Sequence, residues 1–526
     1  MRDFQLPGRS AAYAANAMCA TDHPHAAATA LDILKQGGNA VDAAIAGAVI
    51  QGLCQPAMTS LGGDCFVLFK PAGTEEVIAL NGSGRAPAAI DPDKLRAEGH
   101  KIMPVESVDT ITVPGAVDAF CRLSADHGRL GLDEVLAPAI KAAREGVVVT
   151  PRASFDWHMA ESTPRGRARD FYMIDGKPPM PGQVFRHAGQ AEVLEKIARH
   201  GREGFYAGAV AEDMVNSLRA EGGVHTLEDF ANTACDYTTP ISGEYRGMEM
   251  LEHPPNGQGA TAILLNNILQ HFDIGDMHPW GADRAHIEAE ASKLAYDARN
   301  RFMAEPDYMT RLGYMLSQDT AKRLAVLIDP KRAMENPSVL SEAVHKETIY
   351  ITVVDRDRNV VSLIYSVFKS FGSGLASDRY GINFHNRGRS FSLERGHPNE
   401  LGGGKRPMHT IIPAMLRQGG KVVMPFGVMG GAYQANGHAR FVSNVVDFGM
   451  NPQEAIDGPR SFPDAGILQV ERGYSDQVHA DLAALGHAVS VPAVPIGGAQ
   501  AIWIDPETGI LQGGSDPRKD GIALGY

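Results

Sequence analysis

The sequence predicts a layered α/β protein in which helices cover β-sheets. Helical periodicity dominates the chain up to about Asp329, and β-branched segments of strand length dominate it after Thr348. The stretch Pro330–Lys346 between them is polar and weakly patterned, as is typical of an exposed linker. A chain of 526 residues is too long for one ordinary hydrophobic core and has room for two to four domain-sized units.

The first predicted elements are two helices and a strand. The helix Ala26–Lys35 should end at a glycine pair, which is a common helix terminus. Asn39 can cap the next helix, Val41–Leu53, whose small apolar side chains on every face predict burial on most sides. The apolar run Cys65–Lys70 has the length of a strand.

Amphipathic periodicity predicts a mainly helical region from Pro114 to Phe230. Within and after it we expect the helices Leu132–Arg144 and Ala191–Arg199, the strand Tyr245–Glu252, the helix Thr261–Gln270 and further helices from Arg284 to Asp329.

The part of the chain after Thr348 begins with a hairpin. Thr348–Asp355 and Val360–Phe368 are rich in β-branched residues and are joined by the charged turn Arg356–Asn359. Later strands are expected at Val422–Phe426, Ile467–Glu471, Ala488–Val491, Ala499–Ile504 and Ile510–Gln512, with helices at Ala439–Phe448 and Asp476–Leu485.

Composition narrows the classes of function. The net charge of −13 and the absence of any Lys/Arg run argue against a nucleic-acid partner, since such binding needs a basic surface. Five scattered cysteines without a CxxC pair, and histidines without ligand spacing, predict no metal and no cofactor. The first residues lack the apolar core of a signal peptide, and no run is long enough to span a bilayer, so we expect no membrane association and a cytoplasmic location.

Thr348 is the residue whose setting points most directly to chemistry. A hydroxyl nucleophile needs a base, and an N-terminal threonine carries its own in the free α-amine. That arrangement requires a cut between Glu347 and Thr348, where the polar linker runs into a strand. On these residues alone, a threonine with an ordinary structural role at a strand start, or a Ser/His/Asp triad elsewhere, stays open.

Motifs spread over the chain resemble, in order, those of the γ-glutamyltransferase family. They are Gly37–Ala46, Gly62–Phe66, Thr239–Gly247, Thr348–Ser362, Phe371–Gly374, Lys405–Thr410, Gly427–Gly431 and Gly514–Arg518. Each match is weak by itself, and their common order across the chain carries the resemblance.

The resemblance implies an N-terminal-nucleophile hydrolase with an αββα four-layer sandwich. The precursor would cut its own Glu347–Thr348 bond into a large subunit, residues 1–347, and a small subunit, residues 348–526, which form the sandwich jointly. Two such heterodimers could in turn pair as a homodimer. Thr348 would be the nucleophile, Ser366 the hydroxyl residue that hydrogen-bonds it, and Gly430 and Gly431 the donors of an oxyanion hole.

Departures from the family pattern concern the residues that hold a γ-glutamyl head group. Ser83 stands where an arginine is expected, with Arg85 two residues on, and Phe368 stands in place of an asparagine. Arg389 is aligned with an aspartate, and His409 and Thr410 with a pair of serines. We therefore predict that these cationic and polar residues (Arg85, Arg389, His409 and Thr410) bind a compact anion.

The pattern is similar to a subgroup that includes oxamate amidohydrolases. The first hypothesis is therefore hydrolysis of a small, oxamate-like acid amide through an acyl-enzyme. The alternatives are hydrolysis of glutathione or other γ-glutamyl amides, removal of a β-lactam side chain, and a non-catalytic binding protein that keeps the fold. A small-molecule amide is the expected partner in the first three cases.

Overall fold

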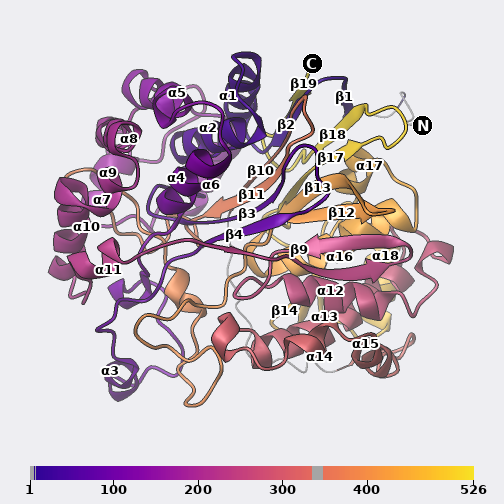
Figure 1. Cartoon of the computed structure of the whole chain (residues 1–526). Coiled ribbons are helices and arrows are strands. Elements are labelled where there is room, and N and C mark those ends of the chain that lie inside the picture. Colours follow the sequence, from indigo (N-terminus) through magenta and orange to yellow (C-terminus); the bar gives the residue numbers. More distant parts are fainter. Residues whose placement is uncertain (1–4, 6–7, 335–347) are drawn as a thin grey trace.

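Two seven-stranded sheets form the centre of the molecule (Figure 1). The computed structural model describes residue 5 and residues 8–334 and 348–526. Most of the predicted linker and Glu347 therefore lie outside the described residues. All strand pairs within the two large sheets are antiparallel.

The two sheets are named here A and B. Sheet A has the order β1 (Ala12–Ala14), β18 (Leu511–Ser515), β17 (Gly498–Ile504), β13 (Lys421–Met429), β12 (Ala414–Gln418), β9 (Met248–Glu252) and β8 (Ile241–Tyr245). Sheet B has the order β19 (Ile522–Gly525), β2 (Met18–Thr21), β10 (Ile349–Val354), β11 (Val360–Ser366), β3 (Asp64–Lys70), β4 (Ile78–Gly82) and β7 (Asp236–Thr238). Each sheet thus combines strands from before and after Thr348.

Helices cover the outer face of each sheet, which completes four layers. The outer face of sheet B packs on α1 (Pro24–Lys35), α2 (Ala40–Cys54) and α4 (Ala116–His127), while α5 (Leu132–Glu145) packs on α2, and α8 (Ala188–His200) on α5. The outer face of sheet A packs on α12 (Gly259–Leu269) and α16 (Gln434–Val446), while α13 (Ala282–Phe302), α14 (Leu312–Leu316) and α15 (Gln318–Ala325) pack on α12. The predicted αββα sandwich is confirmed.

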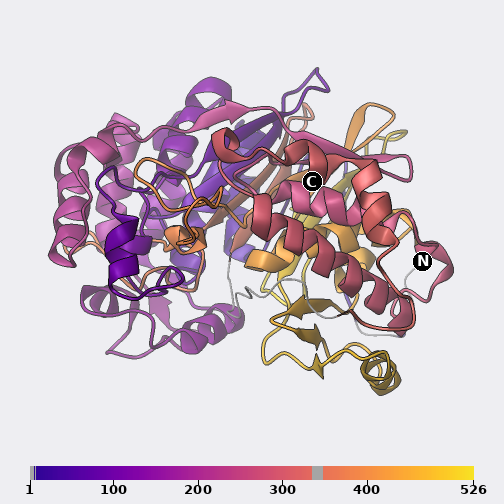
Figure 2. The same cartoon turned by 90° about the horizontal axis from the view of Figure 1, so that it is seen from below.

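The remaining elements surround this centre. On the side of sheet B lie α3 (Pro92–Ala97), β5 (Val147–Val148), α6 (Pro151–Met159), α7 (Arg167–Tyr172), β6 (Val184–Phe185), α9 (Glu203–Tyr206), α10 (Gly208–Ala220) and α11 (Leu227–Ala231). Near sheet A lies α17 (Pro452–Asp457), and β14 (Ser461–Asp464), β15 (Ile467–Val470), α18 (Asp476–Ala484) and β16 (Val489–Ser490) form a projection below it (Figure 2). No helix among the described residues is both long and apolar enough to cross a bilayer.

The space between the sheets is filled by apolar side chains. Five of them form one cluster: Phe66, Tyr350, Ile364, Ile411 and Met429. The sheets approach closely here, because a Cβ atom on Gly427 of β13 would lie 2.3 Å from the Tyr350 ring. Glycine at this position therefore allows β13 to lie against β10.

Alternation along the strands decides which side chains face sheet A. In β10, Ile349 and Ile351 pack on the helices, whereas Tyr350 points into the inter-sheet cluster. Because successive side chains on a strand point to opposite faces, Thr348 lies on the same side as Tyr350. The same rule places Ser366 beside Ile364, and Asp64 beside Phe66, on the inter-sheet side.

Most predicted elements are present, with one clear error. Asn39 caps α2 with a full capping box, as its position suggested, and the hairpin that starts at Thr348 is β10 and β11. The predicted strand Tyr245–Glu252 is correct over Met248–Glu252 (β9) but begins too early, because the chain turns at Arg246 and Gly247 and Tyr245 ends β8. Both turn residues have positive φ, as the tight hairpin requires. In the sequence only Gly247 indicated such a turn, because an arginine rarely adopts positive φ.

Candidate active site

Thr348 lies directly before β10 and is 1% exposed. Its Oγ1 donates a hydrogen bond of 3.3 Å to Oγ of Ser366, the last residue of β11. The register of the hairpin explains this contact, because Ile349 pairs with Tyr365 and the next pair outward is Thr348 with Ser366. Ser366 Oγ also accepts the backbone N–H of Phe368 at 2.8 Å.

Gly430 and Gly431 follow β13 and lead into α16. Their φ values of 120° and 58° favour glycine, and a Cβ on Gly430 would come within 2.9 Å of Gly497 Cα. Among the described residues, neither of their N–H groups donates to a protein acceptor. Two free N–H groups on a turn without side chains can stabilise an oxyanion.

Gln258 connects this turn to the segment that contains His409 and Thr410. Its Nε2 donates to the carbonyl oxygens of Thr410 at 2.7 Å and of Gly431 at 3.0 Å. Its Oε1 accepts from Nη1 of the buried Arg299 at 3.0 Å. The glycine turn and Thr410 are thereby held next to each other.

Asp64 is a fully buried carboxylate on the first residue of β3. Its Oδ1 accepts the N–H groups of Gly84 and Gly115, each at 3.1 Å, and its Oδ2 lies 3.0 Å from Nε2 of His409. Although burial opposes ionisation, the neighbouring His385, His409 and Arg387 hold the pKa of Asp64 well below its usual range. Asp64 is therefore a buried carboxylate that stays ionised and holds His409 in place.

His409 is also fully buried, and burial with the nearby Arg387 lowers its pKa to about 3. The ring is therefore neutral near pH 7, with Nε2–H donating to the Asp64 carboxylate. Nδ1 is then left as an acceptor, and among the described residues it has no hydrogen-bond partner.

Arg387 is a cation that acts electrostatically on both members of this pair, and its sequence position did not single it out. Its Nη1 donates to Thr410 Oγ1 at 2.9 Å, and its guanidinium carbon lies 4.3 Å from the centre of the Phe368 ring. Phe368 has a φ of 80°, which is rare for a residue with a side chain and is typical of functional sites. Burial lowers the pKa of Arg387 to about 9, so the group stays cationic at neutral pH.

Two predicted substrate-binding arginines lie in different surroundings. Arg85 has 42% of its side chain exposed, and it pairs with Glu305 and donates to the Gly404 carbonyl, so its charge is already compensated. Arg389 is partly buried, its Nε has no acceptor among the described residues, and burial lowers its pKa.

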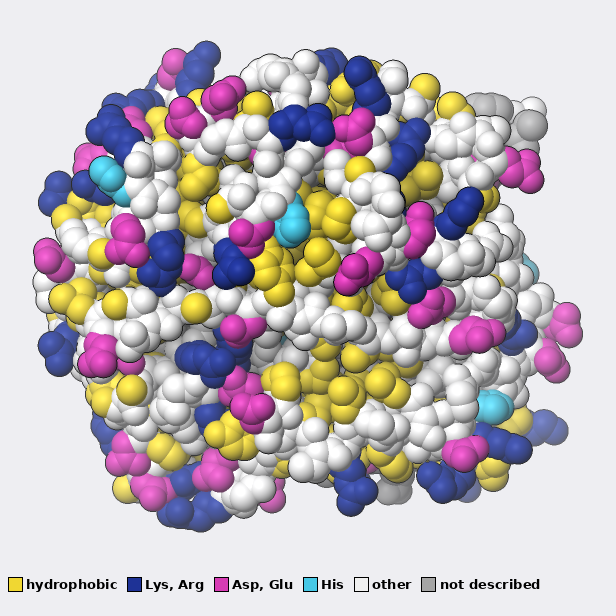
Figure 3. Space-filling model, in the orientation of Figure 1, with side chains coloured by type: hydrophobic (Ala, Val, Ile, Leu, Met, Phe, Trp, Pro, Cys, Tyr) yellow, Lys and Arg dark blue, Asp and Glu magenta, His cyan; other side chains and the backbone are white. Residues whose placement is uncertain are grey.

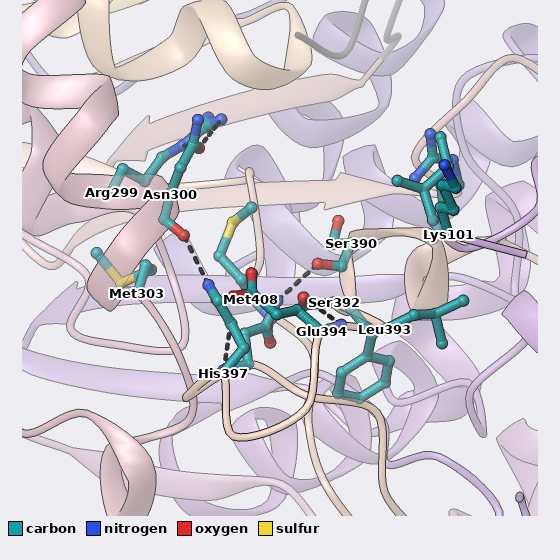
Figure 4. A pocket seen from close by; sticks show the side chains of 14 residues that line it. Lys101, Arg299, Asn300, Met303, Ser390, Ser392, Leu393, Glu394, His397 and Met408 are labelled. Carbon is teal, nitrogen blue, oxygen red and sulfur yellow. Dashed lines mark hydrogen bonds between the residues drawn. The ribbon is translucent and has the colours of Figure 1, made fainter. Parts of the chain in front are cut away.

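Arg389 lines a cavity of about 220 Å³ beside the site (Figure 4). The apolar part of the lining includes Met303, Phe391 and Met408, and the polar part includes Ser390 and Asn399. Met408 directly precedes His409, and Ser390 directly follows Arg389, so the cavity adjoins both candidate binding segments. A small ligand near Arg389 would have room here.

Three described side chains could hold a metal ion away from this centre. The ligand atoms of His286, Glu290 and His487 lie within 4.8 Å of one another. However, the two histidines are hydrogen-bonded to each other at 2.7 Å, and Lys293 Nζ lies 2.7 Å from the Glu290 carboxylate. The cluster is satisfied as a polar network.

Charges on the face seen in Figure 3 are mixed, with basic and acidic side chains interspersed. The local concentration of positive charge thus belongs to the buried site rather than to this face. Buried cations that outnumber nearby carboxylates favour a small anion.

Comparison with known proteins agrees with the geometry. The sequence profile of the family described as gamma-glutamyltranspeptidase matches residues 26–526. The chain belongs to this family. Membership in the gamma-glutamyltranspeptidase family identifies it as an enzyme that acts on amide bonds, and the family resemblance seen in the sequence is confirmed.

Relatives within the gamma-glutamyltranspeptidase family carry different names. The chain is 35% identical to the glutathione hydrolase-like YwrD proenzyme of Bacillus subtilis, over 94% of this chain and 95% of that protein. It is 30% identical to the oxamate amidohydrolase proenzyme of Klebsiella pneumoniae, over 97% and 98%. The solved cephalosporin acylase from Bacillus halodurans superposes with a TM-score of 0.93 at 36% identity, covering 100% of this chain and 99% of that one.

Proposed function

We propose that this chain is a precursor that cuts its own Glu347–Thr348 bond and then hydrolyses amides with Thr348. The observation that carries the proposal is the placement of Thr348 at the start of β10, with Oγ1 hydrogen-bonded to Ser366 on the inter-sheet side. After the cut, residues 1–347 and 348–526 would be the two subunits. Since Thr348 is only 1% exposed in the uncut chain, we expect access to substrate to follow cleavage.

The proposed reaction has two steps. Thr348 Oγ attacks the amide carbonyl carbon while its proton passes to the α-amine of the same residue. The C–N bond then breaks, the leaving nitrogen takes that proton, and an ester to Thr348 remains. Water attacks this ester and releases the acid. The N–H groups of Gly430 and Gly431 are suited to stabilise the oxyanion in both steps.

Ser366→Ala tests the role assigned to the hydroxyl that touches the nucleophile. We expect self-cleavage and amide turnover to slow by about 10- to 100-fold, because Thr348 loses the contact that orients it. Ser362→Ala is a matched control, since Ser362 lies on the same face of β11 but bonds the Tyr350 hydroxyl at 2.6 Å. Equal rates for the two variants, measured by fragment appearance and product release, would contradict the assignment.

The favoured substrate is a small acid amide of the oxamate type. Arg387 and Arg389 supply positive charge, Lys369 lies near Arg389 and Glu106, and Asp64 is a carboxylate bonded to His409. An anionic substrate would balance this excess of cations. Hydrolysis of glutathione or another γ-glutamyl amide is the second candidate, favoured by the names of several relatives and by the acceptor Nδ1 of His409, which suits an N–H donor.

A pair of assays on the cleaved enzyme separates these candidates. Ammonia release from oxamate, with little release of p-nitroaniline from γ-glutamyl-p-nitroanilide, would support the first. Strong turnover of the anilide with none of oxamate would refute it in favour of the second. An uncut chain with no turnover of either compound would instead support a non-catalytic homologue.

A further inference from the structure

Arg387 has one edge of its guanidinium group without partners. The side chain is fully buried, and Nη1 is used by Thr410, but Nε and Nη2 have no acceptor among the described residues. These two nitrogens form the edge of a guanidinium that binds a carboxylate through two parallel hydrogen bonds. A buried cation with this edge unused is costly unless an anion joins it.

Among the residues that the structure describes, none around Arg387 supplies that anion. Asp64 is the carboxylate that lowers the cost of burying Arg387, yet its oxygens bond Gly84, Gly115 and His409. The Phe368 ring covers one face of the guanidinium and offers no acceptor. The missing partner is therefore expected to come from a ligand.

His409 leaves a second unused atom next to the first. Thr410, which accepts from Arg387, is its neighbour in the chain, and Nδ1 of His409 is a buried acceptor without a donor. Because Nε2 carries the proton and donates it to Asp64, the tautomer of the neutral ring is fixed. Nδ1 carries no proton and can therefore only accept a hydrogen bond. Arg387 and His409 together are therefore suited to bind a carboxylate that has an N–H group close to it.

Contacts connect this pair to the reacting atoms. Phe368, beneath Arg387, donates its N–H to the same Ser366 oxygen that accepts from Thr348. On the other side, Gln258 joins the Thr410 carbonyl to that of Gly431. The residues that carry the unused atoms are thus linked by direct contacts both to the nucleophile and to the glycine turn.

We propose that Arg387 and His409 form the subsite that recognises a substrate head group of the form N–C–COO⁻. Arg387 binds the carboxylate through Nε and Nη2, and His409 Nδ1 accepts an N–H from the nitrogen on the adjacent carbon. Oxamate and the head group of an α-amino acid share this chemistry. The proposal rests on the proposed function for its place in the reaction, but glycine, which has no amide bond to cut, reports binding without turnover.

Calorimetry on the cleaved enzyme tests the subsite directly. We expect oxamate or glycine to bind, while oxamide and glycinamide, in which an amide replaces the carboxylate, and acetate, which lacks the N–H, bind at least 10-fold more weakly. Tighter binding of oxamate would indicate a small acid amide as the natural substrate, and tighter binding of glycine would indicate a substrate with an α-amino-acid head group. Equal affinity for oxamate and oxamide, and for glycine and glycinamide, would overturn the proposal without any variant.

Arg387→Met and Arg387→Lys then assign the effect to one residue. We expect carboxylate ligands to lose about 100-fold in affinity in the first, because two charge-assisted hydrogen bonds are lost, while lysine restores only part. Arg395→Met is the matched control, since Arg395 lies eight residues on and is 71% exposed. Unchanged affinity in both Arg387 variants would refute the assignment.

The two proposals fail in different ways. An enzyme that binds oxamate or glycine through Arg387 but shows no Thr348-dependent turnover would refute the proposed function and keep the subsite. An active enzyme whose KM for its substrate is the same in wild type and Arg387→Lys would keep the function and refute the subsite. Self-cleavage of each variant into its two fragments reports that it has folded.

Discussion

Thr348→Ala is expected to yield a single uncut chain of 56.3 kDa without amide turnover. The substitution removes the only atom proposed to attack both the Glu347–Thr348 bond and the substrate, so both reactions are lost together. We expect turnover to fall by at least about 10⁴-fold, as when other covalent nucleophiles are removed. A denaturing gel and product release measure the two effects.

Two further variants make this result specific. Thr348→Ser keeps a hydroxyl and should still cut and turn over, at a reduced rate. Thr352→Val changes a buried threonine two alternations along the same strand, whose Oγ1 bonds the Val361 carbonyl, and should cut normally. For the wild type, sequencing of the smaller fragment should read Thr-Ile-Tyr-Ile. Full activity in the uncut Thr348→Ala chain would refute the mechanism.

Asp64→Asn should be among the most destabilising single changes in the site. It leaves Arg387 without the charge that favours its burial and weakens the bond that fixes His409. Breaking a buried charge network in this way costs about 3–5 kcal/mol. Thermal unfolding of the uncut Thr348→Ala precursor, with and without Asp64→Asn, measures the loss in free energy of unfolding without interference from self-cleavage.

Asp297→Asn provides the contrast, because Asp297 pairs with Arg301 at the surface of α13 and such pairs contribute less than about 1 kcal/mol. A comparable loss of stability in both variants would contradict the role of Asp64.

The pH dependence of stability gives a second test of Asp64. Its pKa is depressed in the folded protein, so its contribution is complete above the ordinary aspartate pKa of about 4. As pH falls below that value the unfolded chain takes up the proton first, and the contribution is progressively lost. Asp64→Asn should lack this component of acid sensitivity, so the difference between the two proteins should shrink as the solution becomes more acidic.

Local signals in the sequence were enough for most individual elements. Asn39 predicted the start of α2, and the β-branched segments after Thr348 predicted the hairpin that carries the nucleophile. Pairings between distant strands were not predictable in this way. β4 pairs with β7 more than 150 residues later, and the local residue pattern of a single sequence does not indicate which distant strands pair.

The candidate site was predictable to the same degree. Ser366 was selected by the family resemblance, and the observed register of β10 and β11, one residue away from that of the predicted turn, brings it to Thr348. Asp64 carried a usable signal, since a carboxylate that opens an otherwise apolar strand demands a buried partner. Arg387 carried none, because it begins a four-residue 3-10 helix, Arg387–Ser390, that also contains Arg389, and its burial depends on Phe368 and Thr410 folding around it.

The interleaving of strands has a consequence for how the proposed cut enzyme assembles. β10 hydrogen-bonds to β2, and β12 to β9, so each sheet joins the segments on either side of the proposed cut edge to edge. Neither piece holds a complete sheet, so neither should reach the native state alone. Self-cleavage would therefore change how the protein refolds. An intact precursor can refold as one molecule, whereas the two subunits of a denatured mature enzyme must first meet by diffusion, at a rate that depends on their concentration.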